Sequence, residues 1–291
     1  MDWEALAASL DPARRHAAAA PRVRALAGGD INRACLLEFD SQRYFVKHNR
    51  AGLEAMFVAE RRGLETILRS GAIRVPRVYQ TGSDSRHAWI AMEYIELTGR
   101  PDPVSLARAL AAMHACEGPY YGFDCDNTIG SNPQPNPPGD DWVAFWRESR
   151  LGFQLRLAES NGLDAALVDA GQRLAERLPA FFAAYRPRAS LLHGDLWSGN
   201  QGADRDGNPV IYDPACYYGD HEADLAMMEL FGHPGERFFA AYRECMPIDV
   251  GYDARRDLYN LYHLLNHANL FGGSYAQQSR RSIERLLALV S

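Results

Sequence analysis

The chain has 291 residues, of which 47% are hydrophobic and 23% are charged, and its formal net charge at pH 7 is -6. A chain of this length can bury a large core and exceeds the usual size of a single domain, which favours two lobes. The negative charge argues against a general nucleic-acid binder.

The N-terminal segment, with Trp3, Glu4, Leu6 and Leu10, has the pattern of an amphipathic helix and not of a signal peptide. No apolar run reaches the length of a transmembrane helix. Five cysteines, an odd number without a C-x-x-C pair, indicate reduced thiols and no zinc site. These features predict a cytoplasmic protein that has no membrane partner.

A glycine-bearing turn at 27–34 lies between a possible strand at 22–26 and another at 35–39. Gly28 and Gly29 would let main-chain amides approach phosphate oxygens closely. The turn does not match G-x-G-x-x-G, so a plain hairpin turn is the alternative.

The next strand pattern, 43–47, alternates polar and apolar residues and ends in Lys47. A helical pattern follows at 53–69 and carries two glutamates that could pair with this lysine. We prefer Glu60, because it flanks the buried stripe of the helix. Glu65 is the competitor, and the glutamate that does not pair with Lys47 is expected to meet a nearby arginine.

Further strands are predicted at 75–79 and 89–95, and the second should end at a hinge that includes Glu93, Tyr94 and Ile95. Ser105 is the predicted N-cap of the first helix beyond the hinge, and His114 is predicted to be a polar residue at its end. Helical periodicity predicts helices at 106–115, 142–161, 167–185, 222–230, 236–243, 254–271 and 275–290.

The segment 132–139 contains four prolines and is predicted to be irregular, because proline lacks an N–H donor and has a fixed φ. It could be a linker or could wall a pocket, and we favour the pocket.

The most informative stretch is 191–200 (LLHGDLWSGN), followed by 210–213 (VIYD). H-x-D-x-x-x-x-N is the catalytic-loop pattern of kinases, in which the Asp accepts the proton of the substrate hydroxyl and the Asn binds Mg²⁺. Asp195 and Asn200 match it, and Asp213 would hold the metal between the β- and γ-phosphates. Either stretch alone, 191–200 or 210–213, could be a set of turn residues, but the two stretches in this order predict a kinase.

A kinase gives the upstream residues their roles, with ATP and Mg²⁺ as the cofactors. Lys47 would reach the α- and β-phosphates, and the turn with Gly28 and Gly29 would cover them. Main-chain groups around 93–95 would take the edge of the adenine.

Several residues near the catalytic loop have competing interpretations. His193 and Trp197 are predicted to contact the substrate, although Trp197 could instead be a core anchor. Asp224 is expected to brace the loop through main-chain hydrogen bonds. Asp220 is the predicted N-cap of the helix 222–230.

His263 and His267 have the i, i+4 spacing of a metal pair, but no glutamate lies between them as in H-E-x-x-H. We therefore expect them to serve packing or hydrogen bonding.

From the glycine-bearing turn to the C-terminus, the chain resembles the fructosamine kinases and bacterial ketosamine kinases, within the aminoglycoside-phosphotransferase-like kinases. The most specific pieces are 192–200 (LHGDLWSGN) and 213–227 (DPACYYGDHEADLAM), with others at 45–47 (FVK), 121–124 (YGFD), 126–130 (DNTIG) and 133–136 (PQPN). Asp-Pro-Ala in place of Asp-Phe-Gly argues against a protein kinase. Some relatives carry a cysteine in the turn that allows redox-controlled dimers, but the matching position here is Asp30.

The resemblance implies an α+β, bilobal protein-kinase-like fold, with a small antiparallel sheet plus one helix at 1–95 and a mainly helical lobe at 96–291. It also implies ATP-dependent phosphorylation of a sugar hydroxyl, typically the 3-OH, on fructosamines or ribulosamines, as deglycation repair. The expected partners are small ketosamines or glycated lysines, and the protein would be a monomer or weak dimer. The alternatives are an aminoglycoside, choline or other small-alcohol kinase, and a catalytically silent ATP-binding regulator.

Overall fold

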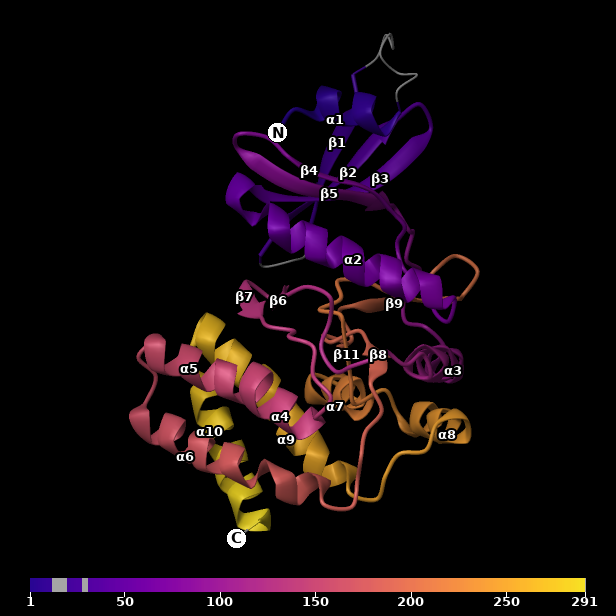
Figure 1. Cartoon of the computed structure of the whole chain (residues 1–291). Helices are drawn as coiled ribbons and strands as arrows, with labels where there is room; N and C mark the ends of the chain where they lie inside the picture. The colour runs from indigo at the N-terminus through magenta and orange to yellow at the C-terminus, as the bar shows by residue number, and fades with distance from the viewer. Residues whose placement is uncertain (12–19, 28–30, 291) are drawn as a thin grey trace.

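Figure 1 shows the computed structural model of the chain, in which residues 1–11, 20–27 and 31–290 are described. The N-terminal lobe, α1 to β5, contains an antiparallel sheet, and the larger C-terminal lobe, α3 to α10, is mainly helical. This α+β arrangement in two lobes is the predicted one. Within the described residues, no helix is long and apolar enough to cross a membrane.

The sheet has the strand order β1-β2-β3-β5-β4, and every neighbouring pair is antiparallel. Its strands are β1 (Arg22–Leu26), β2 (Arg33–Phe39), β3 (Gln42–Arg50), β4 (Val78–Ser83) and β5 (His87–Glu93). The central strand β3 places Lys47 opposite Ala34 of β2 and Ile90 of β5. The lysine is therefore held in the middle of the sheet, where its position is fixed on both sides.

Two helices cover the two faces of this sheet. Successive strand residues point to opposite faces, so Ile90 and Ala91 belong to different layers. Helix α2 (Glu54–Ser70) packs in one core cluster with Ile90, and α1 (Trp3–Leu10) packs in a second cluster with Ala91. The amphipathic N-terminal helix is confirmed, and its apolar side covers the sheet face opposite α2.

The C-terminal lobe combines helices with short two-stranded ribbons, which carry the loops of the cavity described below. Its helices are α3 (Pro103–His114), α4 (Trp142–Phe145), α5 (Gly152–Ser160), α6 (Ala165–Arg177), α7 (Glu222–Leu230), α8 (Glu236–Cys245), α9 (Tyr252–Phe271) and α10 (Ser274–Leu289). Its strands are β6 (Asn127–Ile129), β7 (Asn132–Gln134), β8 (Ser190–Leu192), β9 (Gln201–Ala203), β10 (Pro209–Ile211) and β11 (Tyr217–Gly219). A π-helical turn, Trp146–Leu151, joins α4 to α5.

Some predicted boundaries were wrong, and proline or a cap explains each difference. Helix α3 begins at Pro103, because Asp102 and not Ser105 is the N-cap: its carboxylate accepts the N–H of Ser105 at 2.9 Å. Strand β4 begins at Val78, beyond Pro76, which has no N–H to pair. Helix α6 ends at Arg177, and a 3₁₀ turn that contains Pro179 replaces its predicted last turns.

The proline-rich segment is more regular than predicted. Residues 132–134 form β7, which pairs with β6 so that Pro133 lies opposite Thr128. A proline is tolerated in a two-stranded ribbon, because the strand can turn its donor-free nitrogen away from the partner. The prediction that the whole segment is irregular was therefore wrong.

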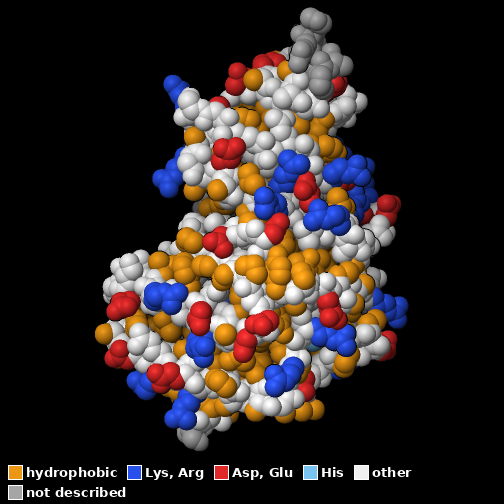
Figure 2. All heavy atoms as spheres, viewed as in Figure 1, with side chains coloured by type: hydrophobic (Ala, Val, Ile, Leu, Met, Phe, Trp, Pro, Cys, Tyr) orange, Lys and Arg blue, Asp and Glu red, His pale blue; other side chains and the backbone are white. Residues whose placement is uncertain are grey.

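One apolar core continues from α2 and β5 into the helical lobe, including Phe57, Ile90, Leu110 and Leu265. Figure 2 shows that the molecule narrows between the lobes and that apolar side chains gather along the C-terminal side of this narrowing. The lobes are thus tied together by packing as well as by the chain. The five cysteines remain free thiols, as predicted.

Candidate active site

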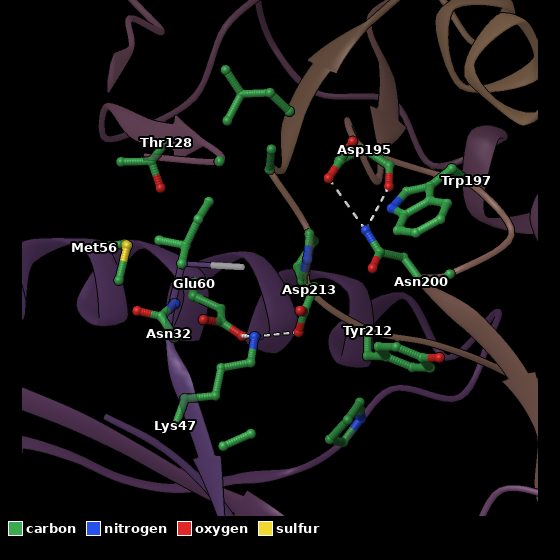
Figure 3. A pocket seen from close by; sticks show the side chains of 18 of the residues that line it. Asn32, Lys47, Met56, Glu60, Thr128, Asp195, Trp197, Asn200, Tyr212 and Asp213 are labelled. Carbon is green, nitrogen blue, oxygen red and sulfur yellow. Dashed lines mark hydrogen bonds and ion pairs between the residues drawn. The ribbon is translucent and has the colours of Figure 1, made fainter. Parts of the chain in front are cut away.

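Both lobes line a cavity of about 920 Å³. The predicted chemical residues meet there: Lys47 and Glu60 come from the N-terminal lobe, and Asp195, Asn200 and Asp213 come from the C-terminal lobe (Figure 3). These side chains are up to 166 positions apart in the sequence. The fold therefore brings the residues of separate sequence motifs together in one cavity.

Lys47 is buried and forms ion pairs with two carboxylates. Its Nζ lies 2.7 Å from Glu60 Oε1 on α2, and it also contacts Asp213 (Figure 3). Burial acts to lower the pKa of Lys47, but the charges of Asp213 and Glu60 outweigh it and raise that pKa. Glu65 instead pairs with Arg61 at 2.6 Å on the surface, so the preferred partner, Glu60, is the one that the structure brings to the lysine.

The catalytic loop connects β8 to β9, and Asn200 is its last residue. The Asn200 Nδ2 donates to the Asp195 carbonyl oxygen at 2.9 Å and to Asp195 Oδ2 at 3.2 Å. These bonds fix the amide so that its Oδ1 is the atom left for a ligand. Burial, and then the charge of Asp213, raises the pKa of Asp195 to about 7, against the hydrogen bond from Asn200.

Asp213 lies two residues after the end of β10 and has φ 59°, a left-handed conformation that non-glycine residues seldom adopt. Such conformations cluster at functional sites, because the surrounding structure must hold them. Asp213 and Asn200 offer oxygen donors, the ligand type that Mg²⁺ prefers, so the donor set fits this metal.

Asp224 on α7 holds the start of the catalytic loop, as predicted. Its carboxylate is buried and accepts the N–H of His193 at 2.7 Å and of Gly194 at 2.8 Å. Gly194 has φ 83°, and a Cβ there would lie 2.1 Å from the Ala215 carbonyl oxygen, so only glycine fits this approach.

His114 is the last residue of α3, as predicted, but it also supports Asp224, which the sequence did not reveal. It is fully buried, with Nε2 3.2 Å from Asp224 Oδ2 and Nδ1 2.7 Å from the Tyr242 hydroxyl. Although burial acts to raise it, the hydrogen bond and charge of His114 help to lower the pKa of Asp224. The imidazole therefore supports the carboxylate that supports the loop.

The structure contradicts substrate contact by His193. Its side chain is fully buried, Nε2 lies 2.9 Å from the Tyr212 carbonyl oxygen, and Nδ1 accepts the Asp195 N–H at 3.2 Å. Both nitrogens are thus used to shape the loop. Trp197, in contrast, is 38% exposed and lines the cavity, beside Asn200 and Asp195 in Figure 3.

The remaining predicted positions are placed as follows. Glu93, Tyr94 and Ile95 line the cavity at the end of β5, but the Glu93 N–H already donates to the Arg77 carbonyl at 2.8 Å. This N–H is therefore not available to an adenine. Gly28, Gly29 and Asp30 lie outside the described residues.

Two further predictions concern Asp220 and the histidine pair. The N-cap of α7 is His221 and not Asp220, so the prediction was wrong by one residue. Asp220 Oδ1 nevertheless accepts the N–H of Glu222 at 3.0 Å and the hydroxyl of Tyr185 at 2.9 Å. His267 Nδ1 bonds the His263 carbonyl at 2.7 Å, which confirms the hydrogen-bonding interpretation. Among the described residues, no group of three or more His, Cys, Asp or Glu could hold a metal ion.

Sequence reasoning missed several residues of the cavity wall. Thr128 of β6 lies there, whereas none of the described lining residues belongs to 132–139, so the predicted wall is formed by the neighbouring strand. Asn32, which follows the glycine pair, also lines the cavity, and its Oδ1 accepts from Asn49 Nδ2 at 2.9 Å. Four aromatic rings, from the residue that follows α7 and from α9 and α10, were also not predicted to line the cavity, although the i, i+4 spacing of His267 and Phe271 was a usable signal.

Comparison with known proteins agrees with this geometry. The sequence profile described as fructosamine kinase matches residues 2–289. The chain belongs to the fructosamine kinase family. As a member of that family, it is an ATP-dependent kinase.

Relatives of this fructosamine kinase family member are similar to it over most of their own length. It is 42% identical to a Synechocystis protein named "Probable ketoamine kinase", over 99% of this chain and 97% of that protein. It is 44% identical to the chloroplastic protein-ribulosamine 3-kinase of Oryza sativa, over 92% of this chain and 79% of that protein.

Solved structures place the family member in the same fold. A Haemophilus somnus protein whose name includes fructosamine-3-kinase has 29% identity and a TM-score of 0.86, covering 98% of this chain and 96% of that one. The aminoglycoside phosphotransferase APH(4)-Ia in complex with AMP-PNP and hygromycin B has 16% identity and a TM-score of 0.66, covering 96% and 98%. The kinase-like fold is therefore confirmed.

Proposed function

We propose that this family member transfers the γ-phosphate of ATP to the 3-OH of a ketosamine, a fructosamine or ribulosamine adduct, and so acts in deglycation. The names of its relatives support the substrate class. The observation that carries the proposal is the exposed ring of Trp197 on the same loop as Asp195, in a cavity also lined by Lys47. A ring beside a carboxylate can meet the C–H face of a sugar while the carboxylate meets its hydroxyl.

In this proposal, Asp195 accepts the proton of the sugar hydroxyl as the hydroxyl oxygen attacks the γ-phosphorus and ADP leaves. A base whose pKa is near 7 suits this transfer at neutral pH. Lys47, held by Glu60, binds the α- and β-phosphates. Asn200 and Asp213 would hold Mg²⁺, which neutralises phosphate charge when bound.

We also propose how the rest of the protein serves the reaction. The lobes span 1–95 and 96–291, and the adenine meets main-chain groups of Tyr94 and Ile95. Gly28 and Gly29 cover the phosphates. The protein works in the cytoplasm as a monomer or weak dimer, on small ketosamines or glycated lysines, without nucleic-acid or membrane partners.

The test is a panel assay of ATP consumption with ketosamines, aminoglycosides and choline, and with Asp195→Asn as the control. Wild-type protein should consume ATP only with ketosamines and should phosphorylate their 3-OH. Asp195→Asn should lose turnover and retain ATP binding, because the amide cannot accept the proton. Turnover with an aminoglycoside alone, or near-wild-type turnover of the variant, would contradict the proposal.

A further inference from the structure

A continuous series of aromatic rings leads from the catalytic loop along the cavity wall. We call the five residues Trp197, Phe231, His267, Phe271 and Tyr275 the aromatic strip. All five line the cavity. Ring centroids are 6.4 Å apart for Trp197 and Phe231, 5.1 Å for Phe231 and His267, and 5.0 Å for His267 and Tyr275. Neighbouring rings are close enough to present one surface to a ligand.

The strip is carried by the catalytic loop and by helices of the C-terminal lobe. Trp197 covers Gly199 so closely that a Cβ on that glycine would lie 2.3 Å from the indole. Phe231 directly follows α7, and His267 and Phe271 lie one turn apart on α9. The hydrogen bond from His267 Nδ1 to the His263 carbonyl, 2.7 Å, fixes the central ring. The surface therefore exists before a ligand arrives, which reduces the cost of binding.

Part of the strip is open to solvent. Phe271 is 56% exposed and Trp197 is 38% exposed, unlike the fully buried rings of the core. Large apolar side chains that stay exposed inside a concave site are typical of ligand contact.

The charges of the cavity restrict what this surface can bind. The described lining residues include four acidic side chains. Glu60 and Asp213 pair with Lys47, and Glu93 pairs with Arg74 at 2.7 Å. Only Asp195 is left, and its proposed role is to accept the sugar hydroxyl. A polycationic acceptor would find no cluster of carboxylates here, whereas a single cation over aromatic faces would be stabilised.

We propose that the aromatic strip binds the amine portion of the acceptor, an inference that rests on the proposed function. The sugar lies near Trp197 and Asp195. The protonated secondary amine of the adduct lies against the ring faces, and its aliphatic arm extends towards Phe271 and Tyr275. The site therefore selects adducts of long alkyl amines, such as the lysine ε-amine, over adducts of short amines.

The test compares two acceptors that share one sugar: the fructosamine of Nα-acetyl-lysine and the fructosamine of methylamine. The wild-type kcat/KM should favour the lysine adduct about tenfold, as expected for roughly two methylene equivalents of apolar burial. Phe271→Ala should raise the KM of the lysine adduct about tenfold and change the KM of the methylamine adduct and of ATP less than twofold.

Two variants serve as controls. Phe271→Tyr keeps a ring at this place and should keep the wild-type preference. Leu289→Ala, at a position 63% exposed at the end of α10, should change neither KM.

Three results would overturn the inference. Equal wild-type kcat/KM for the two adducts would do so, and so would an equal loss of both in Phe271→Ala. If wild-type protein phosphorylates neither adduct but accepts another alcohol, the proposed function itself fails.

Discussion

Replacing Asp224 by asparagine should separate loop positioning from chemistry. The carboxylate is 1% exposed and accepts the N–H groups of His193 and Gly194 at 2.7 and 2.8 Å, with His114 at 3.2 Å. Asparagine keeps the volume and one oxygen. Its NH₂ group, however, must face one of these donors, and the negative charge is lost.

The magnitude follows from these contacts. A hydrogen bond to a charged group contributes about 1.5–3 kcal/mol, and a buried donor without an acceptor costs about 1–3 kcal/mol. We therefore expect Asp224→Asn to lower the free energy of unfolding by about 3 kcal/mol and Tm by about 6 °C. Because Asp195 lies directly after the released Gly194, a displacement of about 1 Å should lower kcat about 100-fold.

The assay measures Tm, kcat and both KM values, with Asp220→Asn as the matched control. Asp220 is also a buried carboxylate at the start of α7, but it binds Tyr185, Tyr259 and the N–H of Glu222, none of which belongs to the catalytic loop. The control should lose stability by a similar amount and keep kcat within about threefold. If Asp224→Asn keeps wild-type kcat, or if both variants lose kcat equally, the positioning role is refuted.

Three further predictions test the metal, the sugar contact and a buried histidine. Asn200→Ala and Asp213→Ala should each weaken Mg²⁺-ATP more than metal-free ATP in calorimetry, because each removes an oxygen donor; equal weakening would make these residues structural. Trp197→Ala should raise the KM for the lysine adduct and for the methylamine adduct. It should leave the KM for ATP and the Tm nearly unchanged, because the ring is 38% exposed. If Trp197 were a core anchor, the substitution would instead lower the free energy of unfolding by about 3–5 kcal/mol. Burial lowers the pKa of His263 to about 3, compared with about 6.5 in the unfolded chain. Between these values, the unfolded state binds the proton and the folded state does not, so the free energy of unfolding should fall by about 1.4 kcal/mol per pH unit as the pH decreases. His263→Gln should remove this part of the slope in urea titrations at pH 4–7, and an unchanged slope would show that His263 is not the cause.

Local sequence patterns determined most of the elements and the chemistry. The strand at 22–26 and the helix at 222–230 have the predicted bounds, because their periodicity and their flanking turns are local properties. The spacing of Asp195 and Asn200 also suffices, since five residues of one loop bring the two side chains into contact. Helical periodicity also favoured Glu60 over Glu65 as the partner of Lys47, because the position of a residue relative to the buried stripe of its helix is a local property.

Only the tertiary structure decided which distant residues share an environment. His114 and Asp224 are 110 positions apart, and no spacing rule reveals that the helix end is buried against the loop. His193 likewise bonds the Tyr212 carbonyl, 19 positions away and just beyond β10. The aromatic strip is drawn from the catalytic loop and from segments near α7, α9 and α10. The sequence of a segment determines which side chains lie on each of its faces. The packing of these faces against one another decides which side chains become buried and hold the loop, and which side chains remain exposed to a ligand.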